Sequence, residues 1–384
     1  MPKIEPEIEA FARIKVIGVG NSGTNAVSHM VRSNVKGVDF IAIDTDAQKL
    51  HHSPVKKKVH IGKNLTRGLG AGMNPEIGRK AAEESLEEIQ NTIKGADMVF
   101  IAGGAGGGTA SGSCAIVAKA AKDQGILTIS VMTKPFFFEG NQRMQIAEKA
   151  IEDIRKEVDA IIIIPNDRLL GNIDKNTSAT TAFAMCDEVL RQAVEGISDL
   201  ITTPGIINVD FADIRAIMQN AGSALMGIGI SAGENRAVDA ARLAINSPLL
   251  DISIDGAKGV LFAIAGDANM TMFEIQEAAK LIIASIDPNA KVIFGAIRDD
   301  KLGKNEIKVT VIASGFPDAP KRKPIFNLGE KIIEDRNDKD KREGKEKLAS
   351  EPTSKTNGPG KKLDADEEED DWSSIPAFLR RSKK

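Results

Sequence analysis

Residues 103–112, Gly-Gly-Ala-Gly-Gly-Gly-Thr-Ala-Ser-Gly, constrain the fold more than any other stretch of this chain. A strand-like run, 97–102, precedes them, and an apolar helical pattern, 114–122, follows. Six of the ten residues are glycine, so the backbone can turn sharply and bring successive N–H groups against an anion at the start of the helix. The pattern predicts a phosphate-binding loop. A flexible linker is the alternative, but linkers are not normally set between a buried strand and an apolar helix. No lysine follows the glycines, which excludes a Walker A loop.

A second glycine cluster lies near the start of the chain. Residues 13–20 are typical of a β-strand, and the spacing of Gly18, Gly20 and Gly23 matches a dinucleotide-binding fingerprint. Asp44 follows the next predicted strand, near the place where an acid would hold a ribose hydroxyl. This part of the chain alone favours an NAD-dependent dehydrogenase.

A third glycine cluster, residues 66–72, precedes a helical pattern at 75–86. Three glycine loops at the carboxyl ends of parallel strands suit a polyphosphate better than a single pyrophosphate. Further strands are predicted at 126–131 and 158–164, each separated from its neighbour by a helical pattern. The alternation to about residue 170 predicts an α/β domain built on a doubly wound parallel sheet.

The second half of the chain begins with a long helical segment, 178–201, which Pro204 and Gly205 end. Asp210 and Asp213 then stand three residues apart at the start of another helix. Their carboxylates suit a functional role and helix capping equally well. Residues 227–317 contain strand patterns near 259–264, 292–297 and 306–312, which predict a second, smaller mixed α/β domain.

Composition changes after Pro317. Residues 335–371 are rich in charged residues and have almost nothing to bury, so we expect a disordered linker over 318–371. Trp372, the only tryptophan, lies with Ile375, Phe378 and Leu379 just before a run of basic residues. Apolar residues at the end of a soluble tether predict a peptide that docks on a partner.

The composition also excludes several classes of protein. The net charge of −3 over 384 residues gives no sign of nucleic-acid binding. We expect a cytosolic protein with no direct membrane insertion, because we find neither a signal-peptide pattern nor an apolar run of about 18 residues. His51, His52 and His60 lack acidic or cysteine partners at matching spacing, so we expect no metal–histidine site. Cys114 and Cys186 lie in apolar helical patterns and should be small buried residues.

The motifs in their order resemble the FtsZ family, the bacterial tubulin homologues that include the GTPase of the division ring. The likeness covers residues 12–316 and resumes at 375–380. The motifs that carry it are Thr45-Asp-Ala-Gln, Gly68-Leu-Gly-Ala-Gly with Asn74-Pro-Glu, the glycine decamer, Lys134-Pro-Phe with Phe138-Glu-Gly and Arg143, Pro165-Asn-Asp, and Asn208-Val-Asp-Phe-Ala-Asp. A dehydrogenase would share only the first unit.

The resemblance implies a tubulin/FtsZ-like fold with six parts. These are an N-terminal extension (1–12), a GTP-binding domain (13–177), a long central helix (178–203), a C-terminal activation domain (204–317), the linker (318–371) and the docking peptide (372–384).

It also implies GTP or GDP with Mg²⁺ as the ligands. Phe183 would stack on the guanine, Asp187 would accept hydrogen bonds from guanine N1–H and the exocyclic amine, and Asn166 and Asn25 would help fix the base. Glu139 and Arg143 would approach the ribose and phosphates, unless they form only a surface pair. The implied nucleotide-binding residues are Gly20, Asn21, Ser22, Gly23, Thr24, Asn25, Asp44, Gly70, Ala71, Gly72, Gly106, Gly107, Gly108, Thr109, Ala110, Ser111, Gly112, Glu139, Arg143, Asn166, Phe183 and Asp187.

The implied mechanism is hydrolysis in trans. Asn208, Asp210 and Asp213 of one subunit would close over the γ-phosphate held by the next, so that a head-to-tail homopolymer completes the site. The resemblance further implies that residues 372–381 dock on a membrane-linked division adaptor such as FtsA, and that the protein works at the division site in midcell.

Six residues in three places depart from the family pattern. Asn21, Ser22 and Thr24 stand in the first loop where glycines are usual, Ala110 and Ser111 alter the decamer, and Asp44 stands where asparagine is usual. We expect the methyl of Ala110 to crowd the phosphates and lower turnover, and the charge of Asp44 to raise the need for Mg²⁺. The alternative function is a divergent paralogue that binds GTP and polymerises but hydrolyses little.

Overall fold

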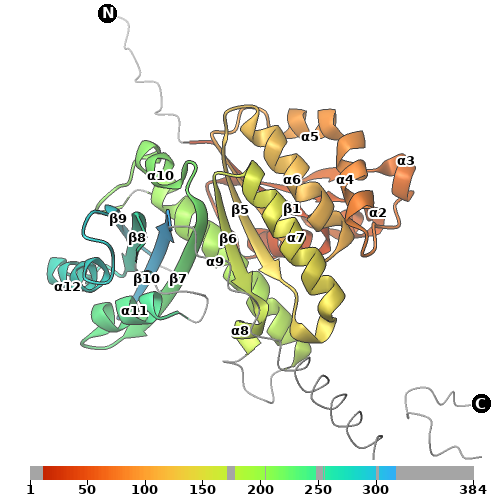
Figure 1. Ribbon diagram of the computed structural model, residues 1–384. Coiled ribbons are helices and arrows are strands. Elements are labelled where there is room, and N and C mark those ends of the chain that lie inside the picture. Colours follow the sequence, from red (N-terminus) through yellow and green to blue (C-terminus); the bar gives the residue numbers. More distant parts are fainter. Residues whose placement is uncertain are drawn as a thin grey trace, which may run out of the picture. The chain divides into compact units, whose positions relative to one another are not determined.

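The computed structural model describes residues 12–170, 178–203, 205–247, 254, 256–299 and 302–316. Figure 1 shows these residues coloured along the chain. The predicted linker (318–371), the docking peptide (372–384) and all but the last residue of the N-terminal extension lie outside the described residues. Among the described residues, no helix combines the length and the apolar character needed to cross a bilayer.

The described strands form one ten-stranded sheet in the order β3-β2-β1-β4-β5-β6-β7-β10-β8-β9. Strands β1 to β6 are parallel, β6 pairs in parallel with β7, β10 is antiparallel to β7 and β8, and β8 pairs in parallel with β9. The strands are β1 (Ile14–Val19), β2 (Val38–Asp44), β3 (Lys57–His60), β4 (Met98–Gly104), β5 (Leu127–Lys134), β6 (Ala160–Pro165), β7 (Gly222–Ala232), β8 (Gly259–Gly266), β9 (Lys291–Arg298) and β10 (Glu306–Ser314).

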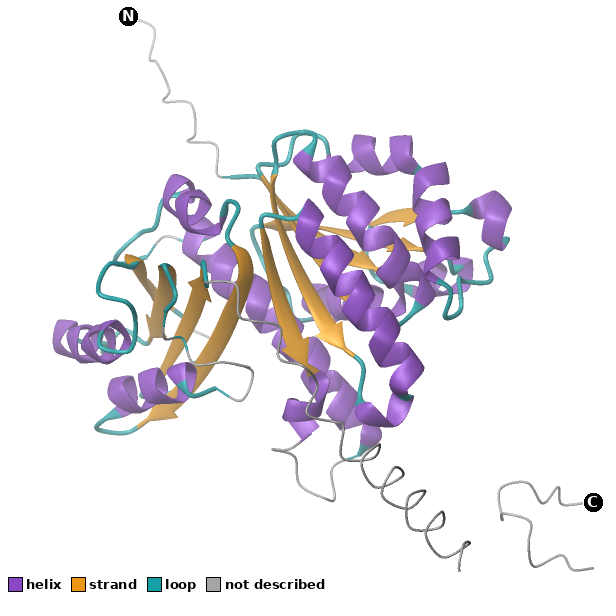
Figure 2. Cartoon of the chain, viewed as in Figure 1, coloured by secondary structure: helices purple, strands orange, loops and turns teal. Residues whose placement is uncertain are grey.

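Helices cover both faces of the first six strands (Figure 2). The helices are α1 (Gly20–Arg32), α2 (Ala47–His52), α3 (Lys63–Thr66), α4 (Pro75–Glu84), α5 (Leu86–Ile93), α6 (Gly108–Lys122), η1 (Phe137–Glu139), α7 (Asn141–Glu157), α8 (Asn166–Leu170), α9 (Ala179–Thr202), α10 (Phe211–Met218), α11 (Arg236–Ile245) and α12 (Met272–Ile283).

Alternation along the strands divides the core between the two faces. In β4, Met98 and Phe100 join the core formed with α1 and α9, whereas Val99 and Ile101 join the core formed with α4 to α7. Successive strand side chains point to opposite faces, so a strand buried on both faces is apolar throughout. The predicted doubly wound parallel sheet is therefore confirmed. Its order of β3-β2-β1-β4-β5-β6 places a topological switch point between β1 and β4, where ligands of such sheets bind.

The later strands carry α11 and α12 on one face, with a third core between them. The other face of β8 and β10 contributes Leu261, Ala263 and Ile312 to the core that also contains α9. Gly196 lets α9 approach β10 closely, because a Cβ there would lie 2.9 Å from Thr310 Cγ2. The long helix α9 thus packs against both halves of the sheet.

Several element boundaries differ from those expected from the sequence. The helices α1 and α6 begin at Gly20 and Gly108, inside the segments predicted as loops. The pattern at 75–86 is two helices, since α4 ends before Ser85 and α5 follows it. Strand β7 begins at Gly222 and was not predicted, because its glycines and small residues lack the β-branched signal of a strand.

Candidate nucleotide site

One cavity of about 500 Å³ opens at the carboxyl ends of the parallel strands, next to the switch point. Its size suits a small-molecule ligand. The residues that line it are Asn21, Ser22, Asn25, Asp44, Asp46, Gly70, Ala71, Gly72, Gly104, Ala105, Gly107, Gly108, Thr109, Ala110, Thr133, Lys134, Pro135, Phe136, Glu139, Arg143, Asn166, Phe183, Cys186 and Asp187. The three glycine clusters of the sequence therefore meet at a single place.

Two helices begin at one end of this cavity. The N-caps of α1 and α6 are Val19 and Gly107, neither of which makes a side-chain cap, and neither helix has an acidic residue in its first turn. The chain reaches these starts through glycines with left-handed backbone, with φ of +69° at Gly20 and +102° at Gly106. Gly108 N donates to Gly72 O at 2.7 Å, but the remaining N–H groups of the two first turns and the positive ends of the two helix dipoles favour an anion, so this end of the cavity is suited to phosphates.

The opposite end is aromatic and acidic. The side chain of Phe183 is 53% exposed, which rules out a purely core role for it, and its ring meets that of Phe136 edge to face at 5.5 Å. Burial raises the pKa of Asp187 to about 6, and nearby His29 opposes the rise. The buried Cys186 has its pKa raised to about 11 by burial and is an inert thiol. An exposed ring beside an acceptor suits a planar base with N–H groups.

Glu139 and Arg143 form an ion pair on the cavity wall. Glu139 Oε1 also accepts a hydrogen bond from Phe136 N at 3.0 Å, which fixes the turn before α7. The pair is therefore partly structural, as its i,i+4 spacing predicts, and also presents a guanidinium to the cavity.

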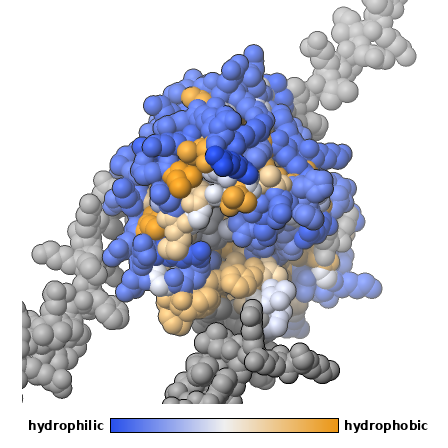
Figure 3. Space-filling view, turned by 90° about the vertical axis from the view of Figure 1, so that its right-hand side faces the viewer, coloured by the Kyte–Doolittle hydropathy of each residue, from blue (hydrophilic) through white to orange (hydrophobic). Residues whose placement is uncertain are grey.

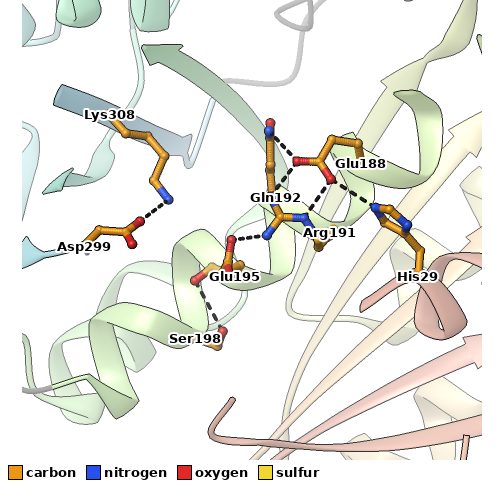
Figure 4. Close-up of polar contacts among 8 residues, drawn as sticks. All are labelled: His29, Glu188, Arg191, Gln192, Glu195, Ser198, Asp299 and Lys308. Atoms are coloured by element: carbon orange, nitrogen blue, oxygen red, sulfur yellow. Dashed lines mark hydrogen bonds and ion pairs between the residues drawn. The ribbon is translucent and has the colours of Figure 1, made fainter. Parts of the chain in front are cut away.

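Helix α9 is anchored to α1 by a polar network that begins at Glu188, the residue after Asp187 (Figure 4). His29 Nε2 lies 3.1 Å from Glu188 Oε2, and Arg191 donates to both Glu188 and the buried Glu195. The Arg191 hydrogen bond lowers the pKa of Glu188 to about 2. A second pair drawn in Figure 4 joins Lys308 of β10 to Asp299, the residue after β9, at 3.3 Å. The network holds the helix that carries Phe183 and Asp187 in one register against α1.

Three buried side-chain oxygens among the described residues have no hydrogen-bond partner: Thr24 Oγ1, Asp44 Oδ2 and Asn166 Oδ1. Asp44 and Asn166 line the cavity, and Thr24 stands beside its wall residue Asn25. Buried polar atoms are normally paired, so orphans gathered around one cavity point to a ligand that pairs with them. Together with the uncapped helices, they show that the residues present fit a phosphorylated, hydrogen-bonding ligand.

Most of the predicted nucleotide-binding residues line this cavity. Six do not: Gly20, Gly23, Thr24, Gly106, Ser111 and Gly112. Gly23 and Gly112 serve packing, because a Cβ would lie 2.3 Å from Ala102 O at the first and 2.0 Å from Pro75 O at the second. Ser111 Oγ accepts a hydrogen bond from Gly106 N at 2.9 Å and so shapes the loop from behind.

The methyl of Ala110 faces the protein as well as the cavity. It lies 3.3 Å from where a Cβ of Gly20 would be and 3.4 Å from that of Gly103. It therefore fills space that those two glycines leave, and Ala110 is only 5% exposed. The sequence predicts that this methyl crowds the phosphates, but it also packs against the protein.

Eight wall residues were not among the predicted nucleotide-binding residues, although six of them lie in the glycine decamer or in the family motifs: Asp46, Gly104, Ala105, Thr133, Lys134, Pro135, Phe136 and Cys186. Most of them follow directly from the carboxyl ends of β4 and β5. The rule that ligands bind at these strand ends would have found them once the strand boundaries were known.

Asn208, Asp210 and Asp213 are exposed, and none of them lines the cavity. Asn208 Oδ1 accepts from Gly205 N at 2.6 Å, and the preceding Ile207 pairs with Ala296 of β9. Asp210 is the N-cap residue of α10 but makes no side-chain cap.

Helix α10, which begins directly after Asp210 and contains Asp213, lies at the amino end of the parallel strands. Arg215 of α10 lines a surface pocket with Leu127, the first residue of β5, and with Asp159, which precedes β6. In Figure 1 the arrowheads of β5 and β6 point toward α8, away from α10. The predicted catalytic residues are thus at the opposite end of the sheet from the cavity.

Comparison with known proteins agrees with this organisation. Residues 13–174 match the Tubulin/FtsZ family GTPase domain, and residues 222–317 match the C-terminal domain of the FtsZ family. An FtsZ dimer structure from M. jannaschii, described as empty, is 44% identical, with 80% of this chain and 89% of that chain covered and a TM-score of 0.77.

Two more distant structures share the fold. CetZ2 from Haloferax volcanii, a GTPγS-bound protofilament, is 21% identical over 86% of this chain and 99% of that one, with a TM-score of 0.69. CetZ1 from the same organism, a GDP-bound monomer, is 22% identical over 84% and 99%, with a TM-score of 0.70. Since the two family models span more than half of the sequence and 44% identity extends over most of it, this chain belongs to the FtsZ family of tubulin-like GTPases.

Proposed function

We propose that this protein is an assembling GTPase of the cell-division ring whose site is completed between two subunits. One subunit binds GTP in the cavity at the carboxyl ends of its strands. The next subunit supplies Asn208, Asp210 and Asp213. The single observation that carries this proposal is that these three residues are exposed at the other end of the sheet, too far round the fold to line their own subunit's cavity.

Guanine is the base that the aromatic end of the cavity suits best. Asp187, with a pKa of about 6, is mainly ionised at neutral pH and accepts from two neighbouring N–H groups, as guanine N1–H and the exocyclic amine require. The orphan Asn166 Oδ1 is a further acceptor, and Phe183 offers an exposed ring for stacking. Adenine presents no N–H at N1 and would leave Asp187 without this pairing.

Magnesium accompanies the triphosphate in this proposal. It usually keeps several waters and binds through substrate phosphates, and it would neutralise charge that develops on the γ-phosphate. The protein's own part is to hold the phosphates on the starts of α1 and α6. The incoming carboxylates of Asp210 and Asp213 then orient or deprotonate the attacking water.

Exposed apolar side chains support a head-to-tail contact. Leu69, Phe137 and Phe138 are 86%, 74% and 60% exposed near the cavity, and Ile206 is 63% exposed beside the Asn208 segment. Large exposed apolar residues beside both halves of the site are typical of an interface. Figure 3 shows apolar side chains gathered in the middle and lower part of one face, with hydrophilic residues around them. The FtsZ dimer and the CetZ2 protofilament are consistent with such self-association.

Phosphate release measured against protein concentration tests the proposal. The rate per subunit should rise steeply once subunits associate, because an isolated subunit lacks a neighbour's carboxylates. A specific rate that stays flat from well below to well above the assembly threshold would falsify hydrolysis in trans. A low rate at every concentration, with filaments still forming, would favour the paralogue that binds and polymerises but hydrolyses little.

The terminal peptide supplies the link to the membrane in this proposal. Residues 372–381 would bind a membrane-linked adaptor such as FtsA and bring the cytoplasmic filament to midcell. Ile375, Phe378 and Leu379 have spacings that let them face one groove of a partner. Deleting residues 372–384 should leave GTPase activity and polymerisation nearly unchanged while abolishing recruitment to the division site. Loss of polymerisation in solution would instead place the peptide within the filament.

A further inference from the structure

Asp44 is a buried acid in a cavity built for anions. It ends β2, is 2% exposed and lines the cavity wall together with Gly70, Gly72 and Thr109. Its neighbour Thr45 is joined to Thr109 at the start of α6 by a 2.7 Å contact between their hydroxyls. The carboxyl of Asp44 therefore lies beside the helix start that is suited to phosphates.

The two carboxyl oxygens of Asp44 have different surroundings. Oδ1 accepts hydrogen bonds from Thr45 N at 2.7 Å and Asp46 N at 3.3 Å. Oδ2 is buried and has no partner in the protein. An ionised carboxylate can only accept, but a protonated one can donate from the second oxygen. Oδ2 is the atom left free to do so.

A polyphosphate in this cavity would face the Asp44 carboxylate at low dielectric. Two like charges in such a place cannot both persist cheaply, and the usual outcome is that one group takes up a proton. Burial already raises the pKa of Asp44 to about 6 in the protein alone. A bound polyanion acts in the same direction.

The other ionisable groups around Asp44 do not cancel this effect. Asp46 adds negative charge and raises the pKa further. His60, which pairs with Asp44 in the sheet, turns its Nε2 to Thr45 O at 3.2 Å. The remaining ionisable residues of the cavity wall are Lys134, Glu139, Arg143, Cys186 and Asp187. Of the two cations, Arg143 is paired with Glu139.

We propose that Asp44 takes up a proton from solvent when the nucleotide binds, and that its neutral carboxyl donates a hydrogen bond from Oδ2 to an oxygen of that nucleotide. This inference rests on the proposed nucleotide site. Proton uptake by Asp44 makes nucleotide binding depend on pH. It also replaces the repulsion between the carboxylate and the phosphates by a hydrogen bond. Asp44 is then a residue that binds ligand as an acid, not as a carboxylate.

The experiment is calorimetric titration of the full chain with GTP, and separately with GDP, at pH 7.5 in buffers that differ in ionisation enthalpy. The enthalpy difference between buffers counts the protons taken up. With a pKa of about 6, Asp44 is roughly 3% protonated at pH 7.5 before binding, so uptake by this group should approach about one proton. The variant Asp44→Asn keeps the shape and a donor but cannot titrate. The unaltered protein should take up about 0.5 to 1 proton more than Asp44→Asn.

The pH dependence of nucleotide affinity should also differ between the unaltered protein and Asp44→Asn. Between pH 7 and 8.5 the affinity of the unaltered protein should fall up to about tenfold per pH unit more steeply than that of Asp44→Asn. Asp39→Asn is the matched control, because Asp39 lies on the same strand but is exposed and far from the carboxyl end. It should behave as the unaltered protein. Protons released or bound by the nucleotide's own phosphates cancel in these comparisons.

Three results would overturn the inference while leaving the nucleotide site intact. Equal proton uptake in the unaltered protein and Asp44→Asn shows that the carboxyl stays ionised. A changed requirement for Mg²⁺ in Asp44→Asn with equal proton uptake assigns Asp44 to the metal. Absence of a protonated-carboxyl infrared band when GTP is added to the unaltered protein also overturns it, and this measurement needs no variant that must fold. If neither GTP nor GDP binds at all, the proposed function itself fails.

Discussion

The polar groups at the two ends of the parallel strands differ in burial and in hydrogen bonding. Around the carboxyl end, three buried side-chain oxygens of the described residues lack partners, and two helices start without side-chain caps. At the other end Asn208, Asp210 and Asp213 are exposed to solvent. A buried polar atom without a partner is costly and is relieved by a small ligand, whereas an exposed carboxylate is solvated and needs no ligand of its own. In the proposed function, the first end therefore binds the nucleotide and the second end contacts another subunit.

The largest expected effect separates these two ends. Asp213→Ala should reduce GTP turnover about 10²- to 10⁴-fold by removing a group that orients or deprotonates water. Affinity for GTP should stay within about twofold, and filaments should last longer, because Asp213 does not line the cavity. Phosphate release, nucleotide binding and filament lifetime check this prediction. Loss of nucleotide from the variant would contradict this prediction, because it would show that residues 208–213 contribute to nucleotide binding in their own subunit.

The next largest effect distinguishes a glycine that packs against the protein, Gly112, from one that lines the cavity, Gly107. Gly112→Ala should destabilise the fold by about 3 kcal/mol, since the new Cβ would lie 2.0 Å from Pro75 O and force α6 away from α4. Gly107→Ala is the matched variant, because its φ of −90° tolerates alanine and a Cβ there meets nothing within 4 Å.

Thermal unfolding and GTP binding distinguish the two. Gly107→Ala should keep the Tm while weakening GTP binding, because the methyl enters the cavity. Equal losses of stability in both variants would contradict the assignment of Gly112 to packing.

A smaller effect is expected from the carboxylate of Asp187, at the end of the cavity proposed to bind the guanine base. Asp187→Asn should weaken GTP binding about 10- to 100-fold by replacing a charged acceptor. The same change should raise the Tm of the nucleotide-free protein at pH 7.5. A carboxyl whose folded pKa is raised to about 6 costs stability that is fully felt above that pH and is recovered as the pH falls through 6 toward the unfolded value. The gain in Tm should therefore vanish near pH 4. A lowered Tm at pH 7.5 would show that Asp187 is paired within the protein.

The smallest effect on function is expected at Ala110. The sequence alone predicts that Ala110→Gly raises turnover, but the methyl packs where Gly20 and Gly103 have no side chain. The change should cost about 1 to 2 kcal/mol of stability through lost packing and lower helix propensity, with turnover altered less than about threefold. Unfolding and single-turnover measurements check this. A tenfold faster turnover with an unchanged Tm would show that the methyl crowds the phosphates after all.

The sequence by itself determined the fold class, the family and most of the cavity wall. Strand and helix periods alternate clearly to about residue 170, and a glycine cluster set between a buried strand and a helix is typical of a phosphate-binding turn. The parallel connections then bring the ends of β1, β2 and β4 together, whatever the detailed packing. The roles of Asn166 and Asp187 needed the family resemblance, because a single polar residue carries no local signal.

Only the tertiary structure decided which glycines line the cavity and which pack against the protein. Gly107 and Gly112 look alike in the sequence, since a missing Cβ leaves the same local pattern whether a phosphate or the backbone of α4 takes the space. It also decided that Asp44 is buried with one oxygen unpaired, and that Asp210 and Asp213 lie across the sheet from the cavity. These facts depend on distances between segments far apart in the chain, which strand and helix periodicity does not encode.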